Sequence, residues 1–409
     1  MPKLRIIHTA DWHLGHQLHG QSREYEHQHF LDWLLKTLKA EQADVLLVAG
    51  DIFDTSNPSA TAQAQFYGFL SQARIQFPNL DIIFIGGNHD SAARLDAPHP
   101  ILDAFNIHIV GGFPIKNNEP DYSRLFIPLH NEQDEIQGWC IAMPFLRPTD
   151  LPLQDDKAVD RLIAGVKQRY QEAIDYAQNY VKEDQFLLAT GHCYMANSSI
   201  SELSERRILG GNQHALPVDI FSDKLDYVAL GHMHLAQQVA KQKHIRYSGS
   251  PIPLSLTEER YKHQILCIEI DNKQQLEIKS LHIPRTVEII RLPKKALPLD
   301  KVLTLITELE LEDLEEEQQP WLELNIKLDQ PQPDLRQKLE KALQGKAVRL
   351  IKITTSYTGN KESLADEVKE ELEDINPEDV FLRRWKQDHE GDIPDHYLNA
   401  FRELVDTAI

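Results

Sequence analysis

Cysteine is scarce in this sequence, and no two of its cysteines lie close together. The chain has 409 residues and only 3 cysteines, Cys140, Cys193 and Cys267, without any CxxC pair. This spacing argues against a disulfide framework and against a zinc site built from thiolates. We therefore expect three small, reduced and buried side chains.

Long apolar runs are missing as well. No stretch is apolar over the length that crossing a bilayer requires, and the N-terminus lacks the charged-then-apolar order of a signal peptide. The sequence therefore predicts a cytoplasmic protein without a membrane segment. With 41% hydrophobic residues, the chain can form one large domain with a full core and one or two smaller units.

Positive charge is in short supply. The chain has 43 Lys and Arg against 63 Asp and Glu, which gives a formal net charge of -20. Non-specific DNA binding depends on cationic side chains that replace condensed counterions. A DNA substrate is therefore compatible with this sequence only if metal ions or a second protein supply positive charge.

Apolar strands alternate with helices over residues 1–275, and this predicts a layered α/β domain. After its first residue, the run DVLLVA is continuously apolar, as in strands that are buried on both faces. The expected strands are Leu4–Ala10, Asp44–Ala49, Asp81–Ile85, Phe186–Thr190, Asp226–Leu230 and His263–Ile270. The expected helices are Arg23–Glu41 with Ser22 as its cap, Ala60–Arg74 and Val159–Val181.

A second pattern begins near residue 284 and ends near residue 357. Strand and helix signals alternate there as a βαβαβ unit, over Val287–Leu292, Leu299–Leu309, Trp321–Leu328, Pro333–Leu343 and Ala347–Thr355. Residues 362–409 have the apolar spacing and capping residues of three short helices. These helices could dock on the parent domain or on the helices of a partner.

Five short motifs follow apolar strands, each at the point where a loop begins. They are Asp11-Trp12-His13, Gly50-Asp51-Ile52-Phe53-Asp54, Gly87-Asn88-His89-Asp90, Gly191-His192 and Gly231-His232-Met233-His234. Because the carboxyl ends of parallel strands share one edge of a sheet, we expect these motifs to converge. Each motif is weak alone, since a Gly-His pair more often marks a turn with a core histidine.

The collected side chains are carboxylates, one carboxamide and several imidazoles, a mixture that suits manganese, iron or zinc. Seven candidate ligands are enough for two cations if one carboxylate bridges them. They are Asp11, His13, Asp51, Asn88, His192, His232 and His234.

The order of these motifs resembles the calcineurin-like metallophosphoesterases, and especially their nucleases of double-strand-break repair. Tracts that support the resemblance are TADWHLG, SREYEHQHFLDW, VAGDIFDT, GGNHDS, YVALGHMH and RYSGSPIPLS, all within residues 1–270. The resemblance implies a β-sandwich flanked by helices over residues 1–275. It also implies an α+β capping domain over residues 284–357 and a helical segment, residues 362–409, that binds the coiled coil of a partner.

The resemblance also implies roles for single residues. Asp11, His13, Asp51 and His234 would hold one metal ion, and Asp51, Asn88, His192 and His232 the other. His89 would face the phosphate and stabilise or protonate the leaving oxygen. Asp90 would orient His89, and Asp54 would support a ligand from outside the coordination sphere.

The implied activity is a manganese-dependent DNA nuclease for repair, recombination and replication. It would be a 3'-5' exonuclease on double-stranded ends and an endonuclease on single strands and hairpins. The implied assembly is a homodimer within a heterotetramer that includes an ATP-binding coiled-coil protein. Two alternatives stay open, namely a phosphoesterase for nucleotides or other small phosphoesters and a scaffold without metals.

Residues outside the motifs could also approach DNA. Trp12 and the histidines His16, His19, His27 and His29 are candidates, although an ordinary helix surface explains most of them equally well. Trp385 is flanked by Arg383, Arg384 and Lys386, which could equally be a solvated helix face.

Overall fold

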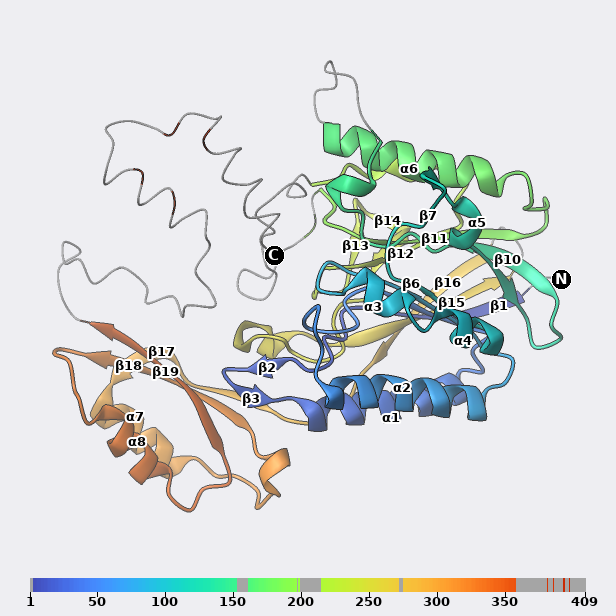
Figure 1. The fold of residues 1–409 in the computed structure, drawn as a ribbon. Helices are drawn as coiled ribbons and strands as arrows, with labels where there is room; N and C mark the ends of the chain where they lie inside the picture. The colour runs from blue at the N-terminus through green and yellow to red at the C-terminus, as the bar shows by residue number, and fades with distance from the viewer. Residues whose placement is uncertain are drawn as a thin grey trace.

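Two six-stranded β-sheets pack against each other and carry helices on their outer faces (Figure 1). The computed structural model describes residues 3–152, 161–196, 198, 215–271 and 275–357, together with the single residues 381, 385, 393 and 397. The helices expected over residues 362–409 therefore lie outside the described residues, as do Arg383, Arg384 and Lys386.

The first sheet has the order β16-β15-β1-β4-β5-β6. Strands β1, β4, β5 and β6 are parallel, whereas β15 and β16 are added as antiparallel neighbours. All five residues of β4 and of β5 are buried, as their uninterrupted apolar sequences predict. The bounds are β1 Lys3–Thr9, β4 Val45–Ala49, β5 Asp81–Ile85, β6 Ile107–Val110, β15 Gln264–Asp271 and β16 Gln275–His282.

The second sheet has the order β13-β14-β12-β11-β10-β9. Its four central strands, β14, β12, β11 and β10, are parallel, and β13 and β9 form antiparallel edges. The bounds are β9 Phe126–His130, β10 Ile136–Ile141, β11 Phe186–His192, β12 Tyr227–Gly231, β13 Gln237–Val239 and β14 Gln242–Tyr247. The predicted layered α/β domain is therefore confirmed as a β-sandwich.

Neighbouring residues of one strand face different layers. In β1, Ile6 belongs to the core between the two sheets, whereas Ile7 packs under the helices α1 (Glu24–Ala40) and α2 (Ala60–Gln76). The helix α6 (Arg161–Ala177) covers the outer face of the second sheet, as Figure 1 shows. The domain thus has four layers, helix–sheet–sheet–helix.

The helix α1 begins one residue later than the sequence predicts. Its N-cap is Arg23, and the predicted cap Ser22 lies in a short strand, although its Oγ accepts a hydrogen bond from Glu24 N at 3.3 Å. The predicted apolar face is confirmed, because Phe30, Leu31, Leu34, Leu35 and Leu38 are all buried. The small elements are β2 Gln17–Leu18, β3 Gln21–Ser22, α3 Ala92–Asp96, α4 His99–Leu102, η1 Asp103–Phe105, β7 Ile115–Lys116, β8 Glu119–Pro120, α5 Tyr122–Leu125, η2 Pro148–Asp150, η3 Val218–Ile220, η4 Leu256–Arg260 and η5 Glu316–Gln318.

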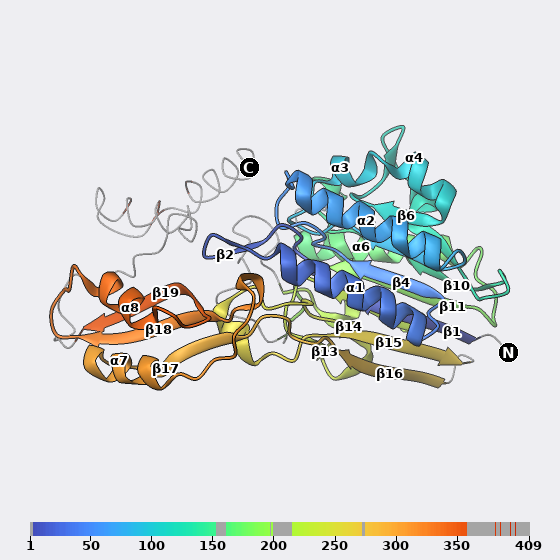
Figure 2. The ribbon, with the colours of Figure 1, turned by 90° about the horizontal axis from the view of Figure 1, so that it is seen from below.

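The unit over residues 289–357 has a core of its own. Its elements are β17 Ile289–Pro298, α7 Leu299–Glu308, β18 Trp321–Leu328, α8 Leu335–Leu343 and β19 Arg349–Tyr357. The three strands form a parallel sheet, and α7 and α8 pack on it around Leu322, Leu324 and Leu339. Figures 1 and 2 place this unit at one end of the sandwich, away from the N-terminus. We call residues 289–357 the capping unit.

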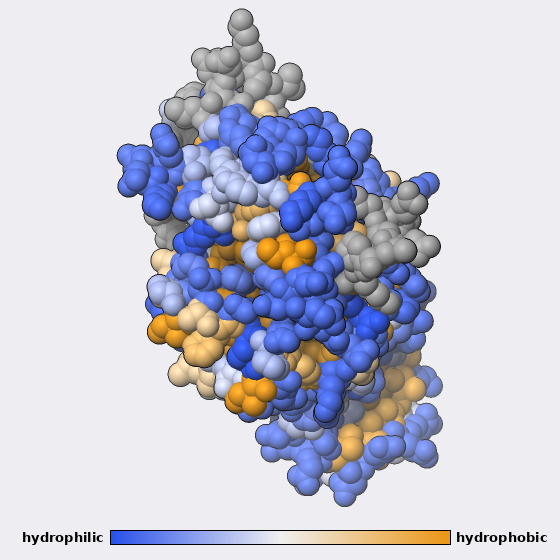
Figure 3. Space-filling view, turned by 90° about the vertical axis from the view of Figure 1, so that its right-hand side faces the viewer, coloured by the Kyte–Doolittle hydropathy of each residue, from blue (hydrophilic) through white to orange (hydrophobic). Residues whose placement is uncertain are grey.

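The opposite end of the sandwich is mainly hydrophilic. Figure 3 shows its hydrophobic side chains in separate small groups among hydrophilic ones. Among the described residues, no helix combines the length and the apolar character that a membrane crossing requires. Cys140, Cys193 and Cys267 are free and buried, which confirms the prediction made from their spacing.

Candidate metal-binding active site

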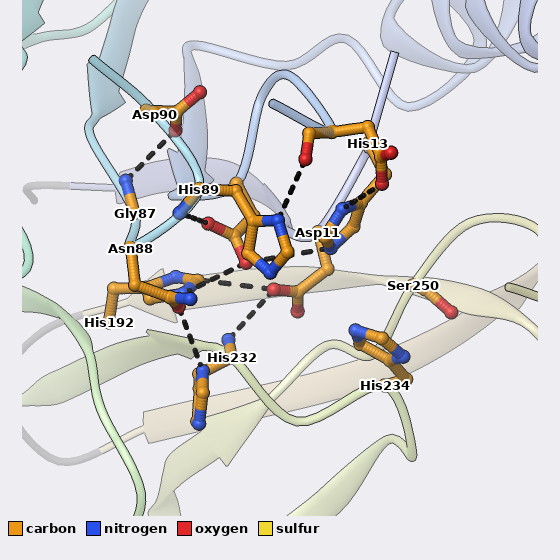
Figure 4. A network of polar contacts seen from close by, with 12 residues as sticks. Asp11, His13, Gly87, Asn88, His89, Asp90, His192, His232, His234 and Ser250 are labelled. Carbon is orange, nitrogen blue, oxygen red and sulfur yellow. Dashed lines mark hydrogen bonds and ion pairs between the residues drawn. The ribbon is translucent and has the colours of Figure 1, made fainter. Parts of the chain in front are cut away.

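All seven predicted ligands meet at one edge of the sandwich, where strands of both sheets end (Figure 4). Asp11 and His13 follow β1, Asp51 follows β4, and Asn88 follows β5. In the second sheet, His192 is the last residue of β11, and His232 and His234 follow β12. The predicted convergence of strand ends is therefore what the structure shows.

Asp11, His13 and His234 form the first group of donors. One donor atom of each lies within 4.8 Å of the others, and the three residues are 0%, 3% and 5% exposed. The Asp11 Oδ1 atom accepts a hydrogen bond from the His232 backbone N–H at 2.8 Å. The Asp11 Oδ2 and His13 Nε2 atoms are buried and have no hydrogen-bond partner. Because buried polar atoms are rarely unpaired, these two are available to a cation.

Asp51, His192 and His232 form the second group, again with donor atoms within 4.8 Å of one another. The Asn88 Oδ1 atom lies 2.9 Å from His192 Nε2 and 3.1 Å from His232 Nδ1. Asp51 Oδ2 is 3.2 Å from His192 Nε2 and 3.5 Å from His13 Nε2, so this carboxylate lies between the two groups.

The rings of three candidate ligand histidines are fixed by hydrogen bonds on the side away from the site. The Nδ1 atom of His192 donates to the Ala49 carbonyl oxygen at 2.9 Å, and that of His13 donates to Asp54 Oδ1 at 3.1 Å. The Nδ1 atom of His234 donates to Glu258 Oε1 at 3.2 Å. In each case, Nε2 is the ring nitrogen that faces the site, which is how proteins usually orient histidines toward metals.

The support of His89 differs from the prediction. Its Nδ1 atom donates to the backbone carbonyl oxygen of Asp54 at 2.8 Å, so Asp54 and not Asp90 orients the ring. The Asp90 carboxylate accepts three backbone N–H bonds, from Ile52, Phe53 and Gly87, at 2.9–3.0 Å. Asp90 therefore joins the loop after β4 to the loop after β5. The hydrogen bond between Asp54 and the candidate ligand His13 agrees with the prediction that Asp54 supports a ligand.

Three glycines leave the space that the donors occupy. A Cβ atom at Gly87 would lie 2.1 Å from Asp51 Oδ1, and one at Gly50 would lie 2.3 Å from His192 Nδ1. A Cβ atom at Gly231 would lie 1.8 Å from the Ala49 carbonyl oxygen. Glycine is therefore needed at these three positions for a steric reason, because any side chain there would displace a donor or the group that supports it.

The backbone is strained at four of the candidate ligands. Asp11, His13, Asp51 and His232 have positive φ angles of 54°, 47°, 47° and 99°. Residues with a β-carbon rarely adopt this region, and each instance costs on the order of 1–3 kcal/mol. Such strain is concentrated at functional sites, and here it turns the donors toward one another.

The charged groups of the site shift one another's pKa values. Burial raises the pKa of the Asp11 carboxyl. Burial also opposes ionisation of Asp51, but the surrounding His192 and His89 hold the pKa of that carboxyl well below its usual range. For His192, burial lowers the pKa, but Asp51 and Asp11 raise it to about 9. A proton therefore balances these carboxylates, and a divalent cation would replace it.

Two divalent cations fit this arrangement of oxygen and nitrogen donors. The unpaired Asp11 Oδ2 and His13 Nε2 atoms and the central place of Asp51 support this interpretation. A third group, His13, Asp54 and His89, also brings three donor atoms within 4.8 Å. It is a weaker candidate, because His13 Nδ1 already contacts Asp54 Oδ1 and His89 Nδ1 already contacts the Asp54 carbonyl oxygen.

Two of the proposed DNA-facing residues belong to the core instead. The Trp12 ring is fully buried against Phe30, Phe69 and Phe84, and its Nε1 atom donates to Thr9 Oγ1 at 3.1 Å. His27 is also fully buried. His16 and His19 are partly buried and His29 is exposed, so only these three could still reach DNA.

Sequence reasoning missed Glu258. This residue lies in η4, is 0% exposed and holds the ring of His234. In the sequence it stands in LTEER, which is typical of a solvated turn. The one available signal was its position just after the RYSGSPIPLS tract.

The fold and the site together define the class of this protein. A family model described as calcineurin-like phosphoesterase matches residues 4–236, which include every predicted ligand. A second model, described as type 5 capsule protein repressor C-terminal domain, matches residues 285–389. The chain is a calcineurin-like phosphoesterase.

Curated relatives narrow this class. The chain is 36% identical to the D subunit of the SbcCD nuclease of Rhodobacter capsulatus, over 86% of this chain and 87% of that protein. It is 32% identical to the protein of the same name in Escherichia coli K12, over 93% and 92% of the two chains. The Bacillus subtilis relative, which also has this name, is 29% identical over 98% of both chains. The chain belongs to the family of SbcD nucleases, which makes it a metal-dependent phosphodiesterase.

Proposed function

We propose that the chain cleaves DNA as the nuclease subunit of a complex with an SbcC-like ATPase. The two groups of donors, with Asp51 between them, carry this proposal, because they can place two cations beside one phosphate. The expected activities are 3'-5' exonuclease action on double-stranded ends and endonuclease action on single strands and hairpins. They would serve DNA repair, replication and recombination.

Two Mn²⁺ ions are the cofactors that we propose. Asp11, His13, Asp51 and His234 would hold one ion, and Asp51, Asn88, His192 and His232 the other, in agreement with the two groups of neighbouring donors. When bound, the ions would supply positive charge to the scissile phosphate and strengthen the attacking water as a nucleophile.

His89 is the catalytic residue in this proposal. The Asp54 carbonyl oxygen holds its Nδ1–H, so Nε2 is the nitrogen that can face the phosphate. From there it would stabilise the developing charge or give a proton to the leaving oxygen. Figure 4 shows the His89 ring over the site, between Asp11 and Asn88.

The capping unit would shape the access of DNA to this edge. It lies at the end of the sandwich where β1 finishes, as Figure 1 shows. Its Trp321 packs with Leu18 and Leu256 of the large domain, so the two units are joined beside the site. Positive charge for the DNA backbone would come from the cations and from the partner, because the chain itself has a net charge of -20.

Residues 362–409 would bind the coiled coil of the ATPase. A pull-down with the full chain and with a chain that ends after Tyr357 tests this, since β19 ends at that residue and the capping unit stays whole. We expect the full chain to retain the partner and the shorter chain to lose it. Retention by both would place the contact elsewhere.

A homodimer within a heterotetramer is the proposed assembly. Exposed apolar side chains on α2, α4 and η1 support a contact between two copies, with Tyr67 39%, Ile101 67% and Phe105 54% exposed. These segments are neighbours, because Arg74 of α2 donates to the Asn106 carbonyl oxygen just after η1. In sedimentation, we expect the parent chain to form a dimer and Phe105→Asp to form a monomer. The same mass for both would place the contact on another surface.

An assay of substrates tests the proposed activity itself. We expect Mn²⁺-dependent release of nucleotides from linear duplex DNA, and little hydrolysis of nucleotides or other small phosphodiesters. Asp51→Ala should abolish the activity. Rapid hydrolysis of small phosphodiesters with no action on DNA would instead assign the chain to the alternative substrate class.

A further inference from the structure

Glu258 holds the metal-ligand candidate His234 and the loop beside it at the same time. Its Oε1 atom accepts from His234 Nδ1 at 3.2 Å, and its Oε2 atom accepts from the Leu254 backbone N–H at 2.9 Å. The Ser250 backbone N–H donates to the His234 carbonyl oxygen at 3.1 Å, so the same loop also fixes the backbone of this histidine. Figure 4 shows His234 beside Ser250, on the side of the site away from Asn88. The position of His234 therefore depends on the loop 250–258.

A buried ion pair anchors this loop to α1. Arg23 is 0% exposed and donates through Nη1 to the Pro253 carbonyl oxygen at 2.7 Å, one residue before Leu254. Its other guanidinium donors contact both carboxylate oxygens of Glu26, one of them at 2.7 Å. A bidentate pair of this kind has a fixed geometry, so it transmits the position of Glu26 to the loop.

The capping unit completes the contact. Trp321, the first residue of β18, is 1% exposed and donates from Nε1 to Glu26 Oε2 at 3.3 Å. The Arg349 guanidinium lies over the Trp321 ring, 3.5 Å from its centroid. The ring also packs in one cluster with Leu256, which belongs to the same turn as Glu258. Trp321 is thus connected to the turn of Glu258 in two ways. One is the chain of polar contacts through Glu26 and Arg23, and the other is apolar packing against Leu256.

We propose that Glu258 is a positioning residue for the metal ligand His234, and that Trp321 of the capping unit supports it through Glu26 and Arg23. Docking of the capping unit thereby sets how tightly the His234 site holds its cation. The proposal rests on the proposed assignment of His234 as a ligand. A partner that pulls on the capping unit would accordingly change metal retention without touching the site.

Mn²⁺ binding to the full chain without DNA tests the role of Glu258. In calorimetric titrations, Glu258→Gln should weaken the His234 site by about 10–100-fold, because its NH2 group would face one of the two N–H groups that now donate to the carboxylate, and the charge beside the histidine is lost. The thermal midpoint of the metal-free variant serves as the second readout. If Mn²⁺ affinity falls while the thermal midpoint stays close to that of the parent protein, Glu258 positions His234. Unchanged affinity overturns the proposal.

Asp81→Asn is the matched control. Asp81 is a buried carboxylate whose Oδ2 lies 3.1 Å from His130 Nδ1, but it begins β5 and is therefore at the opposite end of that strand from Asn88. This variant should reduce thermal stability and leave Mn²⁺ affinity unchanged. If it weakens Mn²⁺ binding as much as Glu258→Gln does, the effect of Glu258 is general destabilisation.

Trp321→Phe tests the contribution of the capping unit. Phenylalanine keeps a ring for the apolar cluster but removes the N–H that reaches Glu26. We expect weaker Mn²⁺ binding, smaller in effect than that of Glu258→Gln, and little further loss when both changes are combined. Full affinity in Trp321→Phe, or two losses that simply multiply, would show that the capping unit is not coupled to His234.

His234→Ala separates failure of this inference from failure of the proposed site. If His234→Ala leaves Mn²⁺ binding unchanged, the ligand assignment itself is wrong. If it weakens binding and Glu258→Gln does not, the assignment stands and the positioning role is wrong.

Discussion

At the scale of single residues, the proposed site separates side chains that would hold metal from one that would act on the substrate. His89 follows the ligand candidate Asn88 directly, yet its Nδ1 atom is bonded to a backbone carbonyl group and not to another donor of the two groups. A ring held in this way can be removed without removing a ligand.

His89→Ala should therefore bind Mn²⁺ like the parent protein and cleave DNA about 10²–10⁴-fold more slowly, the usual contribution of a general acid. Calorimetry with Mn²⁺ and single-turnover cleavage of a duplex would measure the two properties. Asp51→Ala is the comparison, because it should lose metal. If His89→Ala instead fails to bind Mn²⁺, His89 is needed to hold the metal and is not only a catalytic residue.

Gly87→Ala should weaken Mn²⁺ binding, because its Cβ atom would lie 2.1 Å from Asp51 Oδ1. Gly68→Ala in α2 is the control, since nothing lies within 4 Å of a Cβ atom there. This helical change should stabilise the protein by about 0.5–1 kcal/mol and leave metal binding intact. Equal affinity in both variants would refute the steric role of Gly87.

The sequence predicted the seven donors and His89 as one group, because each follows an apolar strand. It could not predict Glu258, whose burial depends on His234 and on a loop that packs against Arg23 of α1. It misassigned Asp90 for the same reason, since the partners of this carboxylate are backbone N–H groups of another loop. Contacts between loops leave no periodic signal in a sequence.

At the scale of elements, the strands that were predicted are the continuously apolar ones, β4 and β5 among them. Several edge and antiparallel strands were not. β9 alternates between buried and partly buried residues and contains Pro128, and β16 has the polar sequence QLEIKSLH. The sequences of such strands resemble those of loops, because half of their side chains face away from the core and need not be apolar.

Asp90→Asn tests how the ends of β4 and β5 are joined. An amide has one oxygen for three N–H donors, so at least one buried donor loses its partner, at about 1–3 kcal/mol. Chemical denaturation should show this loss together with weaker Mn²⁺ binding. Asp96→Asn, which removes the negative charge that pairs with Arg124 and accepts from the Gly111 N–H after β6, should lower stability alone. Normal metal binding in Asp90→Asn would mean that the two loops keep their positions without this carboxylate.

At the scale of the whole molecule, several histidines are buried without charge. Burial lowers the pKa of His8 to about 3 and that of His263 to about 4, and it lowers the pKa of His27 well below its usual value. In the unfolded chain these groups take up a proton near pH 6.5. Their contribution to stability is therefore complete above pH 6.5 and is lost as the pH falls toward the folded values.

The free energy of unfolding, measured with chelator present, should fall between pH 6.5 and pH 5 by up to about 1.4 kcal/mol per pH unit for each such histidine. His8→Gln removes one of these titrations and still offers a polar group to Tyr227, so its decline should be shallower. A stability that does not change over this range would contradict the assignment.

Metal removal should also lower stability, because the donors come from both sheets. At a free Mn²⁺ concentration 100-fold above the dissociation constant, one bound ion would add about 2.7 kcal/mol to the free energy of unfolding. Thermal scans with Mn²⁺ and with chelator would measure this difference. The same scans of Asp51→Ala should show a much smaller one.

The division of the donors between two sheets also has a consequence for biosynthesis. Asp11, His13, Asp51 and Asn88 leave the ribosome early, but His192, His232 and His234 follow only after the second sheet has begun to emerge. A nascent chain that ends before these histidines has only half of a coordination sphere. On the proposed ligand assignment, the polypeptide could retain its cations only after these histidines have emerged, so metal loading would be a late event in the maturation of the enzyme.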